Sequence, residues 1–206
     1  MEKTKYISII FDDGPRFPMS EMIEKFIENN HRCGFAIIGK NISDDTEKVL
    51  KFAIDNGFEL CSHGQNHVGL PDLTKEYIYI ELFTPINEIE RRFGYKITTA
   101  RAPYLWADDN VFEVCKKHNL PLLGQGITVA HDWEDSVSAD EIADSFIKNI
   151  YDGAIVCLHV KQNTLTALDK IFPFLKAENY ELLTPSDLFK IKNIENIPLD
   201  RQITRV

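Results

Sequence analysis

The chain has 206 residues, enough for one domain with a sizeable core. Hydrophobic residues make up 44% of it and charged residues 27%, which is ordinary for a globular protein. The formal net charge of -9 argues against nucleic acid and anionic membranes as main partners. No apolar run approaches the roughly 18 residues that a membrane-spanning helix needs.

The N-terminus shows no signal-peptide core, because residues 1–5 lead directly into the first apolar segment. We therefore expect a cytoplasmic protein, or a secreted or cell-wall protein if an export segment once preceded Met1. The four cysteines are Cys33, Cys61, Cys115 and Cys157. They lie in apolar segments without a Cys-x-x-Cys pair, so we expect buried, reduced thiols.

Apolar segments alternate with segments of helical periodicity along the chain. Short apolar runs predict strands at 6–11, 32–39, 58–62, 96–103, 122–128, 154–158 and 180–183. Apolar residues at helical spacing predict helices at 20–30, 44–56, 74–94, 108–119, 138–150, 165–178 and 186–191. This alternation predicts one parallel α/β domain, and an open sheet and a barrel both fit it. Residues 1–192 are predicted to form the domain and 193–206 a C-terminal tail.

The first predicted strand ends in two adjacent carboxylates, Asp12 and Asp13, which Gly14 and Pro15 follow. A turn in which an Asp bonds its own backbone explains one carboxylate at such a place. Two neighbouring carboxylates on a buried strand repel each other unless a cation or another partner compensates. Because α/β folds place their ligand sites at the carboxyl ends of strands, the pair indicates a site.

Other polar residues follow further predicted strands at the same edge of the sheet. They are His63, His67, Arg101, Asp132, Trp133 and His159. Each alone has an ordinary explanation: a strand-end histidine is usually structural or solvated, an Asp or Arg usually makes a surface ion pair, and a tryptophan usually packs in the core. Their convergence from separate elements is harder to explain by accident.

The spacing of the two histidines suggests a metal centre. His63 and His67 are four residues apart, so on one helical turn both imidazoles face one ion. With one carboxylate of the acidic pair they make three ligands and leave room for water, as in catalytic zinc centres. The other carboxylate is then free to take a proton from that water. Arg101 is suited to hold this base ionised, and His159 to act as general acid.

Five segments, in order, resemble the motifs of the polysaccharide deacetylase family, also described as the NodB homology domain or carbohydrate esterase family four. They are residues 11–15 (FDDGP), 63–67 (HGQNH), 101–104 (RAPY), 132–133 (DW) and 155–159 (IVCLH). The resemblance covers nearly the whole chain. It implies a single α/β domain, built as a distorted (β/α) barrel of about seven parallel strands, that removes acetyl groups from a sugar polymer.

The resemblance also implies a role for each catalytic residue. Asp12 would be the base and would pair with Arg101, and Asp132 would orient the acid, His159. One divalent ion would be bound, with zinc expected first and cobalt, nickel or manganese as alternatives. The implied ligands of this ion are Asp13, His63 and His67.

Four residues would contact substrate on the same resemblance, namely Tyr104, Trp133, Cys157 and Leu158. The backbone N–H of Tyr104 would help to hold the oxyanion, and the other three residues would line the pocket for the acetyl group. The sequence departs from the family pattern at Gly64, Leu105, Val129, Cys157 and Val160. No departure removes an expected metal ligand, the base or the acid, and those at Val129 and Cys157 bear on substrate shape.

The resemblance, taken with these patterns, implies a metal-dependent deacetylase acting on N-acetyl groups of N-acetylglucosamine-containing oligo- or polysaccharide, of chitin or peptidoglycan type. One alternative is an acetylxylan O-esterase, since attack by an activated water is common to both reactions. Others are a catalytically inactive, metal-bearing carbohydrate-binding domain and a cytoplasmic small-molecule amidohydrolase. The expected partner is the acetylated saccharide, with no nucleic acid, membrane or protein partner.

Overall fold

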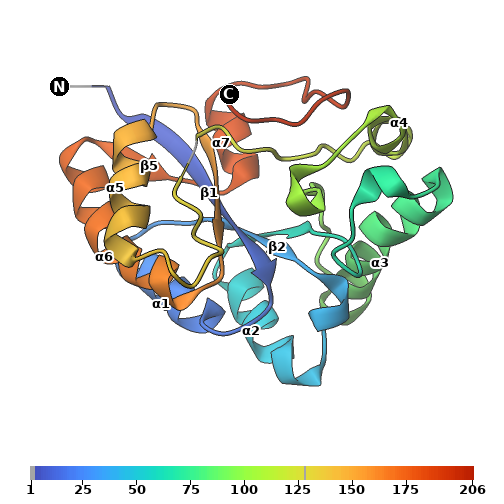
Figure 1. The fold of residues 1–206 in the computed structure, drawn as a ribbon, viewed down its shortest axis with the longest axis horizontal. Helices are drawn as coiled ribbons and strands as arrows, with labels where there is room; N and C mark the ends of the chain where they lie inside the picture. The colour runs from blue at the N-terminus through green and yellow to red at the C-terminus, as the bar shows by residue number, and fades with distance from the viewer. Residues whose placement is uncertain (1–2, 128) are drawn as a thin grey trace.

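The computed structural model describes residues 3–127 and 129–206. Strand β1 (Lys5–Gly14) crosses the centre of the molecule, and helices surround it (Figure 1). Around it lie β2 (Gly34–Ile37), β3 (Glu59–Ser62), β4 (Ile155–His159) and β5 (Tyr180–Leu182). The strand order is β3-β2-β1-β4, β5 pairs with the start of β1, and every pair is parallel. The prediction of one parallel α/β domain is confirmed.

Two predicted strands, 96–103 and 122–128, contribute single bridge pairs, and residue 128 lies outside the described residues. Ser62 of β3 pairs with Ala100, and Ala100 pairs with Leu122. Prolines at 103 and 121 supply no N–H to a ladder, and glycines at 124 and 126 weaken a strand, which limits regular pairing here. The sheet of the described residues therefore has five regular strands, fewer than the seven expected.

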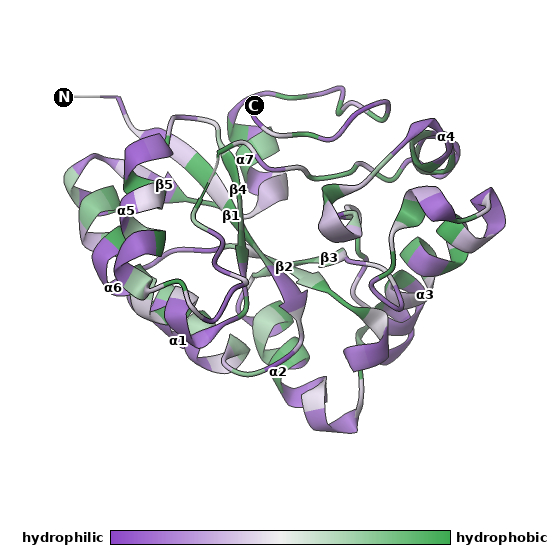
Figure 2. Ribbon diagram, in the orientation of Figure 1, coloured by the Kyte–Doolittle hydropathy of each residue, from purple (hydrophilic) through white to green (hydrophobic). Residues whose placement is uncertain are grey.

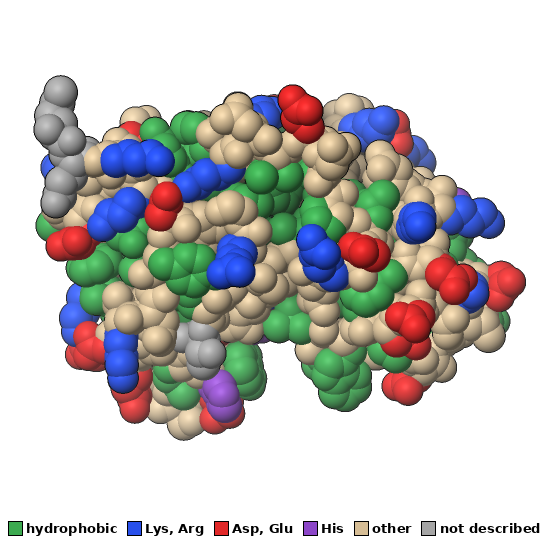
Figure 3. Space-filling model, turned by 90° about the horizontal axis from the view of Figure 1, so that it is seen from above, with side chains coloured by type: hydrophobic (Ala, Val, Ile, Leu, Met, Phe, Trp, Pro, Cys, Tyr) green, Lys and Arg blue, Asp and Glu red, His purple; other side chains and the backbone are tan. Residues whose placement is uncertain are grey.

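The helices pack around this sheet and present their polar sides outward. They are α1 (Met19–Glu28), α2 (Asp44–Asp55), α3 (Lys75–Phe93), α4 (Asp109–Lys117), α5 (Ala139–Asn149), α6 (Gln162–Ala177) and α7 (Pro185–Ile191). Figure 2 shows hydrophobic residues along the central strands and hydrophilic residues on the outer helix surfaces. No helix of the described residues is both long and apolar enough to cross a bilayer. Acidic and basic side chains are mixed on the face seen from above (Figure 3).

Side chains of β1 alternate between two hydrophobic clusters. Ile9 and Phe11 belong to the larger cluster, which the helices cover, whereas Ile10 belongs to a smaller cluster with residues of α7. Residues two apart on a strand point the same way, so Asp12 shares the face of Ile10. The fold therefore sets Asp12 above the smaller cluster, at the carboxyl end of the central strand. The four cysteines are free and buried, as predicted.

Residues 193–206 are packed against the rest of the chain. The N–H of Ile203 donates to the carbonyl of Leu122 at 2.8 Å, and the N–H of Ile155 donates to the carbonyl of Thr204 at 3.1 Å. The side chain of Ile203 is buried in the smaller cluster. This segment thus lies between the 122–124 segment and the start of β4, so hydrogen bonding passes from β3 around to β4. A domain boundary after residue 192 stays a prediction.

The burial of Ile203 leads to a stability prediction. Ile203→Ala should lower the free energy of unfolding by about 3 kcal/mol, because it leaves a cavity in the smaller cluster. Chemical denaturation followed by circular dichroism measures this change. Ile191→Ala is the control, since Ile191 of α7 is 44% exposed. Equal, small losses in the two variants would contradict a structural role for the C-terminal segment.

Candidate active site and metal centre

The end of β1 brings both carboxylates of the acidic pair to one place. In a regular strand Asp12 and Asp13 would point to opposite faces. The pairing of β1 with β2 is irregular between Phe11 and Gly14, and Asp13 has the left-handed backbone angle φ 69°. Such bulges redirect side chains next to active sites. Here the Oδ2 atom of Asp12 and the Oδ1 atom of Asp13 lie 3.7 and 3.8 Å from the same atom, His63 Nε2.

Asp13, His63 and His67 form a three-donor set. One donor atom from each lies within 4.8 Å of the others, and His67 Nε2 is 3.4 Å from Asp13 Oδ1. His63 Nδ1 is 2.9 Å from the carbonyl oxygen of Arg101, which only accepts, so Nδ1 carries the proton. The Nε2 lone pair of His63 is therefore directed to the set, as in histidines that ligate metals. Two imidazoles and one carboxylate fit a catalytic zinc-type ion.

Asp12 lies beside this set but is bound by Arg101. Arg101 is fully buried; its Nε donates to Asp12 Oδ2 at 2.8 Å and its Nη1 donates to the carbonyl of Gly124 at 2.7 Å. Burial would raise the pKa of Asp12, but the positive charge of Arg101 leads the effects, its hydrogen bond among them, that outweigh burial and hold the pKa below its usual value. Asp12 is thus an ionised carboxylate. Its other oxygen, Oδ1, is buried without a hydrogen-bond partner among the described residues, which is unusual outside functional sites.

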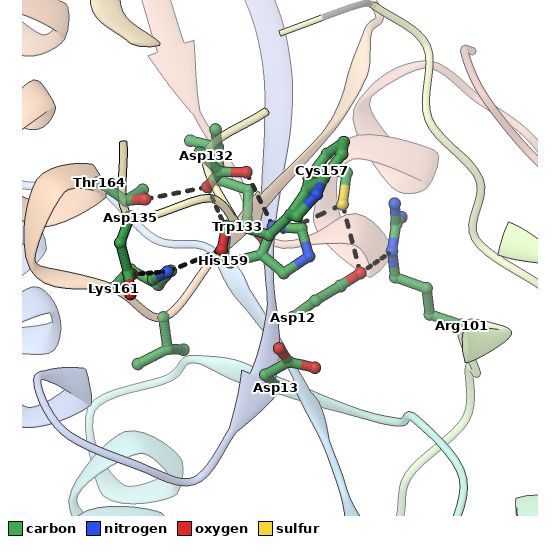
Figure 4. Close-up of polar contacts among 12 residues, drawn as sticks. Asp12, Asp13, Arg101, Asp132, Trp133, Asp135, Cys157, His159, Lys161 and Thr164 are labelled. Atoms are coloured by element: carbon green, nitrogen blue, oxygen red, sulfur yellow. Dashed lines mark hydrogen bonds and ion pairs between the residues drawn. The ribbon is translucent and has the colours of Figure 1, made fainter. Parts of the chain in front are cut away.

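His159 is held on the other side of Asp12 by a buried aspartate (Figure 4). Asp132 Oδ1 lies 2.8 Å from His159 Nδ1, and Asp132 Oδ2 accepts from the N–H of His159 and from the hydroxyl of Thr164 at 2.6 and 2.9 Å. Burial would lower the pKa of His159, but the hydrogen bond to Asp132 and the charge of Asp12 raise it above its usual value. The imidazole is therefore fixed in orientation and favoured in its protonated form.

Backbone strain is concentrated at this site. Among the described residues, the non-glycine positions with positive φ comprise four asparagines in turns after helices, at 30, 119, 179 and 193, and four residues at the site. The latter are Asp13, His67, Tyr104 and Leu105. Each such conformation costs on the order of 1 kcal/mol or more and persists only where its surroundings enforce it. Two of the predicted metal ligands, Asp13 and His67, therefore owe their positions to left-handed backbone conformations.

Comparison with known proteins places this geometry in a family. The family model described as polysaccharide deacetylase matches residues 1–123, more than half of the chain. The chain belongs to the polysaccharide deacetylase family. The expectation that rested on the five motifs is thereby confirmed.

Two curated relatives and one solved structure show how this family member compares. The chain is 28% identical over 196 residues to a bifunctional xylanase/deacetylase from Pseudobutyrivibrio xylanivorans, covering 94% of this chain and 32% of that protein. It is 23% identical over 190 residues to a peptidoglycan-N-acetylglucosamine deacetylase from Bacillus cereus, covering 89% of this chain and 68% of that protein. A family 4 acetyl xylan esterase from Clostridium thermocellum, in complex with a cobalt ion, aligns with a TM-score of 0.89 at 26% identity, covering 98% of this chain and 99% of that one. The chain thus spans about a third of the first relative and about two thirds of the second.

Within this family fold, the histidine loop has a support that the sequence did not reveal. Glu81 of α3 is buried and accepts hydrogen bonds from the backbone N–H and the side-chain amide of Asn66 at 2.8 and 2.6 Å. Gly64, one of the departures from the family pattern, has φ +77°, and a Cβ there would lie 3.2 Å from Glu81 Oε2. Glu81 is three residues after Ile78, so it falls on the apolar stripe of its helix. A carboxylate among the apolar residues of this helix is the sequence feature that could have indicated a buried, functional Glu81.

The two predicted pocket residues on β4 lie on opposite faces. Cys157 is buried beside the site, with its Sγ 3.2 Å from Asp12 Oδ2. Leu158 is fully buried in the larger cluster under the helices, so the structure does not bring it to the site. The reason is strand alternation: residue 158 must point away from the face that 157 and 159 share.

Exposed aromatic rings lie on two sides of the acidic pair. Tyr104 contacts the His67 ring at 4.7 Å between ring centroids, and Trp106 lies 5.2 Å beyond Tyr104. On the other side Trp133 lies 5.5 Å from the His159 ring. About half of each of the three aromatic side chains is exposed. The site is thus open between aromatic walls, an arrangement suited to the apolar face of a sugar ring.

The support by Glu81 leads to a prediction about metal affinity. Glu81→Ala should weaken zinc binding about 10-fold to 100-fold, since loss of an outer contact misplaces the ligands on the histidine loop. Competition with a chelating dye measures the dissociation constant. Glu90→Ala, at an exposed position of the same helix, should leave zinc affinity unchanged. Unchanged affinity in Glu81→Ala would show that the loop holds its shape without Glu81.

Proposed function

We propose that the protein is a metal-dependent deacetylase that hydrolyses N-acetyl groups of N-acetylglucosamine-containing oligo- or polysaccharide, of peptidoglycan or chitin type. The observation that carries this proposal is the ionised carboxylate of Asp12, which stays outside the three-donor set yet lies 3.7 Å from His63 Nε2. Hydrolysis of an amide by an activated water needs a base at such a place. The peptidoglycan-N-acetylglucosamine deacetylases among the relatives support the substrate class.

One divalent ion is proposed for Asp13, His63 and His67, with zinc first and cobalt, nickel or manganese as alternatives. The ion, when bound, would polarise the acetyl carbonyl and increase the acidity of a water molecule. The donor types support this assignment, as does the cobalt-bound family member.

The side chains of this protein would carry the proton transfers. Asp12 accepts a proton from the attacking water while Arg101 holds its carboxylate in place. His159, fixed by Asp132, donates a proton to the leaving nitrogen of the sugar. General acid and base groups of this kind each accelerate a reaction typically about 10²-fold to 10⁴-fold.

Three further residues would position the substrate. The backbone N–H of Tyr104 is proposed to donate to the oxygen that becomes negatively charged, a contact usually worth about 3 kcal/mol. The next residue, Leu105, is anchored by its carbonyl, which accepts a hydrogen bond from Gln202 at 2.7 Å. Trp133 and Cys157 are proposed to line the pocket for the acetyl group.

An acetylxylan O-esterase is the second candidate. Two observations favour it: the identity to the xylanase/deacetylase and the close alignment with the cobalt-bound acetyl xylan esterase. Acetate release from N-acetylglucosamine oligomers and from acetylxylan, measured in parallel on the zinc-loaded protein, distinguishes the two. Faster release from acetylxylan would overturn the N-deacetylase proposal. A zinc-loaded protein that releases acetate from neither would instead support a carbohydrate-binding role.

The assignment of base and ligand is tested by a matched pair of variants. Asp12→Asn should keep the metal but lose at least about 10²-fold in kcat, because the base is removed. His63→Ala should lose the ion of the Asp13, His63 and His67 set, so that metal analysis by mass spectrometry finds one equivalent less than in the wild-type protein. Unchanged kcat in Asp12→Asn would refute the base, and full metal content in His63→Ala would remove His63 from the centre.

The role of His159 predicts a change in pH dependence. The bond to Asp132 raises the pKa of His159, so the acid form persists to higher pH than in a free histidine. Asp132→Asn should therefore move the alkaline limb of the kcat/KM profile to lower pH. Asp135→Asn is the control, because Asp135 is exposed and pairs with Lys161. An alkaline limb that stays in place in Asp132→Asn would exclude His159 as the acid.

A further inference from the structure

A second three-donor set consists of Asp12, Cys157 and His159. The proposed reaction uses Asp12 and His159 for proton transfer and not as metal ligands. One donor atom from each lies within 4.8 Å of the others. The sheet explains the grouping: Asp12 is the direct partner of His159 across β1 and β4, and Cys157 points to the same face two residues earlier. The set adjoins the Asp13, His63 and His67 set but shares no residue with it.

Each donor of this second set has an atom available for an ion. His159 Nδ1 is bound to Asp132, and its Nε2 makes no hydrogen bond in the part of the chain that the structure describes. A carboxylate behind the ring is the usual arrangement of a metal-bound histidine. Asp12 is 96% buried and its Oδ1 has no partner among the described residues. The Cys157 thiol donates to the same carboxylate, with its Sγ 3.2 Å from Asp12 Oδ2.

We propose that Asp12, Cys157 and His159 form a second metal site, selective for thiophilic divalent ions such as zinc, cadmium or cobalt over magnesium or manganese. The sulfur donor carries this selectivity, because thiolates favour soft ions and oxygen donors favour hard ones. Binding breaks the S–H bond of Cys157 and the Nε2–H bond of protonated His159, forms a sulfur–metal and a nitrogen–metal bond, and releases both protons to solvent. The thiolate and the Asp12 carboxylate then balance the charge of the ion.

Occupancy of this site inhibits hydrolysis, a consequence that rests on the proposed function. Asp12 no longer accepts a proton from water when its carboxylate is a ligand. His159 no longer donates one when its Nε2 is a ligand. One ion therefore withdraws both the base and the acid, so an excess of zinc over one equivalent stops the enzyme that the first equivalent activates.

The binding step is tested without any assay of activity. The metal-free protein is titrated with cobalt(II), and the near-ultraviolet charge-transfer band of a cobalt–thiolate bond is recorded. We expect no band during the first equivalent and its growth during the second. Cys157→Ala should abolish the band, whereas Cys115→Ala, at a buried cysteine of α4, should leave it unchanged.

A third variant separates the two sites. His63→Ala, which lacks a ligand of the first set, should still show the band. Absence of the band in the wild type, or its persistence in Cys157→Ala, would overturn the proposal. A band that appears with the first equivalent and is lost in His63→Ala would also overturn it, because Cys157 would then belong to a single centre.

X-ray absorption of the wild-type protein checks the sulfur ligand directly. X-ray absorption with two equivalents of zinc should show a sulfur neighbour at about 2.3 Å that is absent with one equivalent.

Inhibition is measured as the zinc concentration that halves acetate release, with the activity of each protein at one equivalent of zinc taken as its full activity. This concentration should be at least about 10-fold higher in Cys157→Ala than in the wild-type protein, since the soft donor is gone. A sulfur neighbour without inhibition would keep the site and refute only its effect on catalysis.

Discussion

The buried ion pair between Arg101 and Asp12 is the constraint on which the rest of the site depends. Both side chains are almost completely withdrawn from water, and placing either charge there alone would cost several kcal/mol. The pair is tolerated because Arg101 also donates to Gly124 and Asp12 faces nearby histidines. Asp12 keeps its charge at the end of the central strand, where a neutral acid would otherwise be favoured.

Around that pair, the protein divides similar groups into different tasks by their surroundings. Asp12 is fixed by an arginine, whereas Asp13 is turned by a left-handed backbone toward two imidazoles. His63 is held by a backbone carbonyl and His159 by a buried carboxylate. The carbonyl behind His63 leaves Nε2 with a free lone pair, and the carboxylate behind His159 raises the pKa of that imidazole and favours the form that can donate a proton. The contacts behind these side chains therefore support the different roles proposed for groups of the same type.

Much of this arrangement was predictable from the sequence because strand ends are strong signals. Apolar runs located the strands, and the polar residues that follow them converge as the parallel sheet requires. Motif resemblance was the weaker guide: it put Leu158 in the pocket, although strand alternation turns that position to the helices. Thr164 and Gln202 were missed because their partners are far away in sequence. Glu81 was missed because its place on the apolar side of α3 does not identify Asn66 as its partner. The segments at 96–103 and 122–128 look like strands by composition, yet proline and glycine leave them single bridges.

The contacts of residues 202–204 with the 122–124 segment, the 105 loop and β4 have a consequence for the order in which the site can form during synthesis. Ile203 closes onto Leu122 and Gly124, the residue whose carbonyl holds Arg101, and Gln202 fixes the loop at Leu105. These contacts join parts of the site that are synthesised much earlier to residues that leave the ribosome later. When all the predicted catalytic residues have been synthesised, the contacts that support Arg101 through Gly124 and Tyr104 through Leu105 are still missing. A chain that stops before residue 202 lacks these contacts, so nothing from the C-terminal segment holds Gly124 and Leu105 in this arrangement.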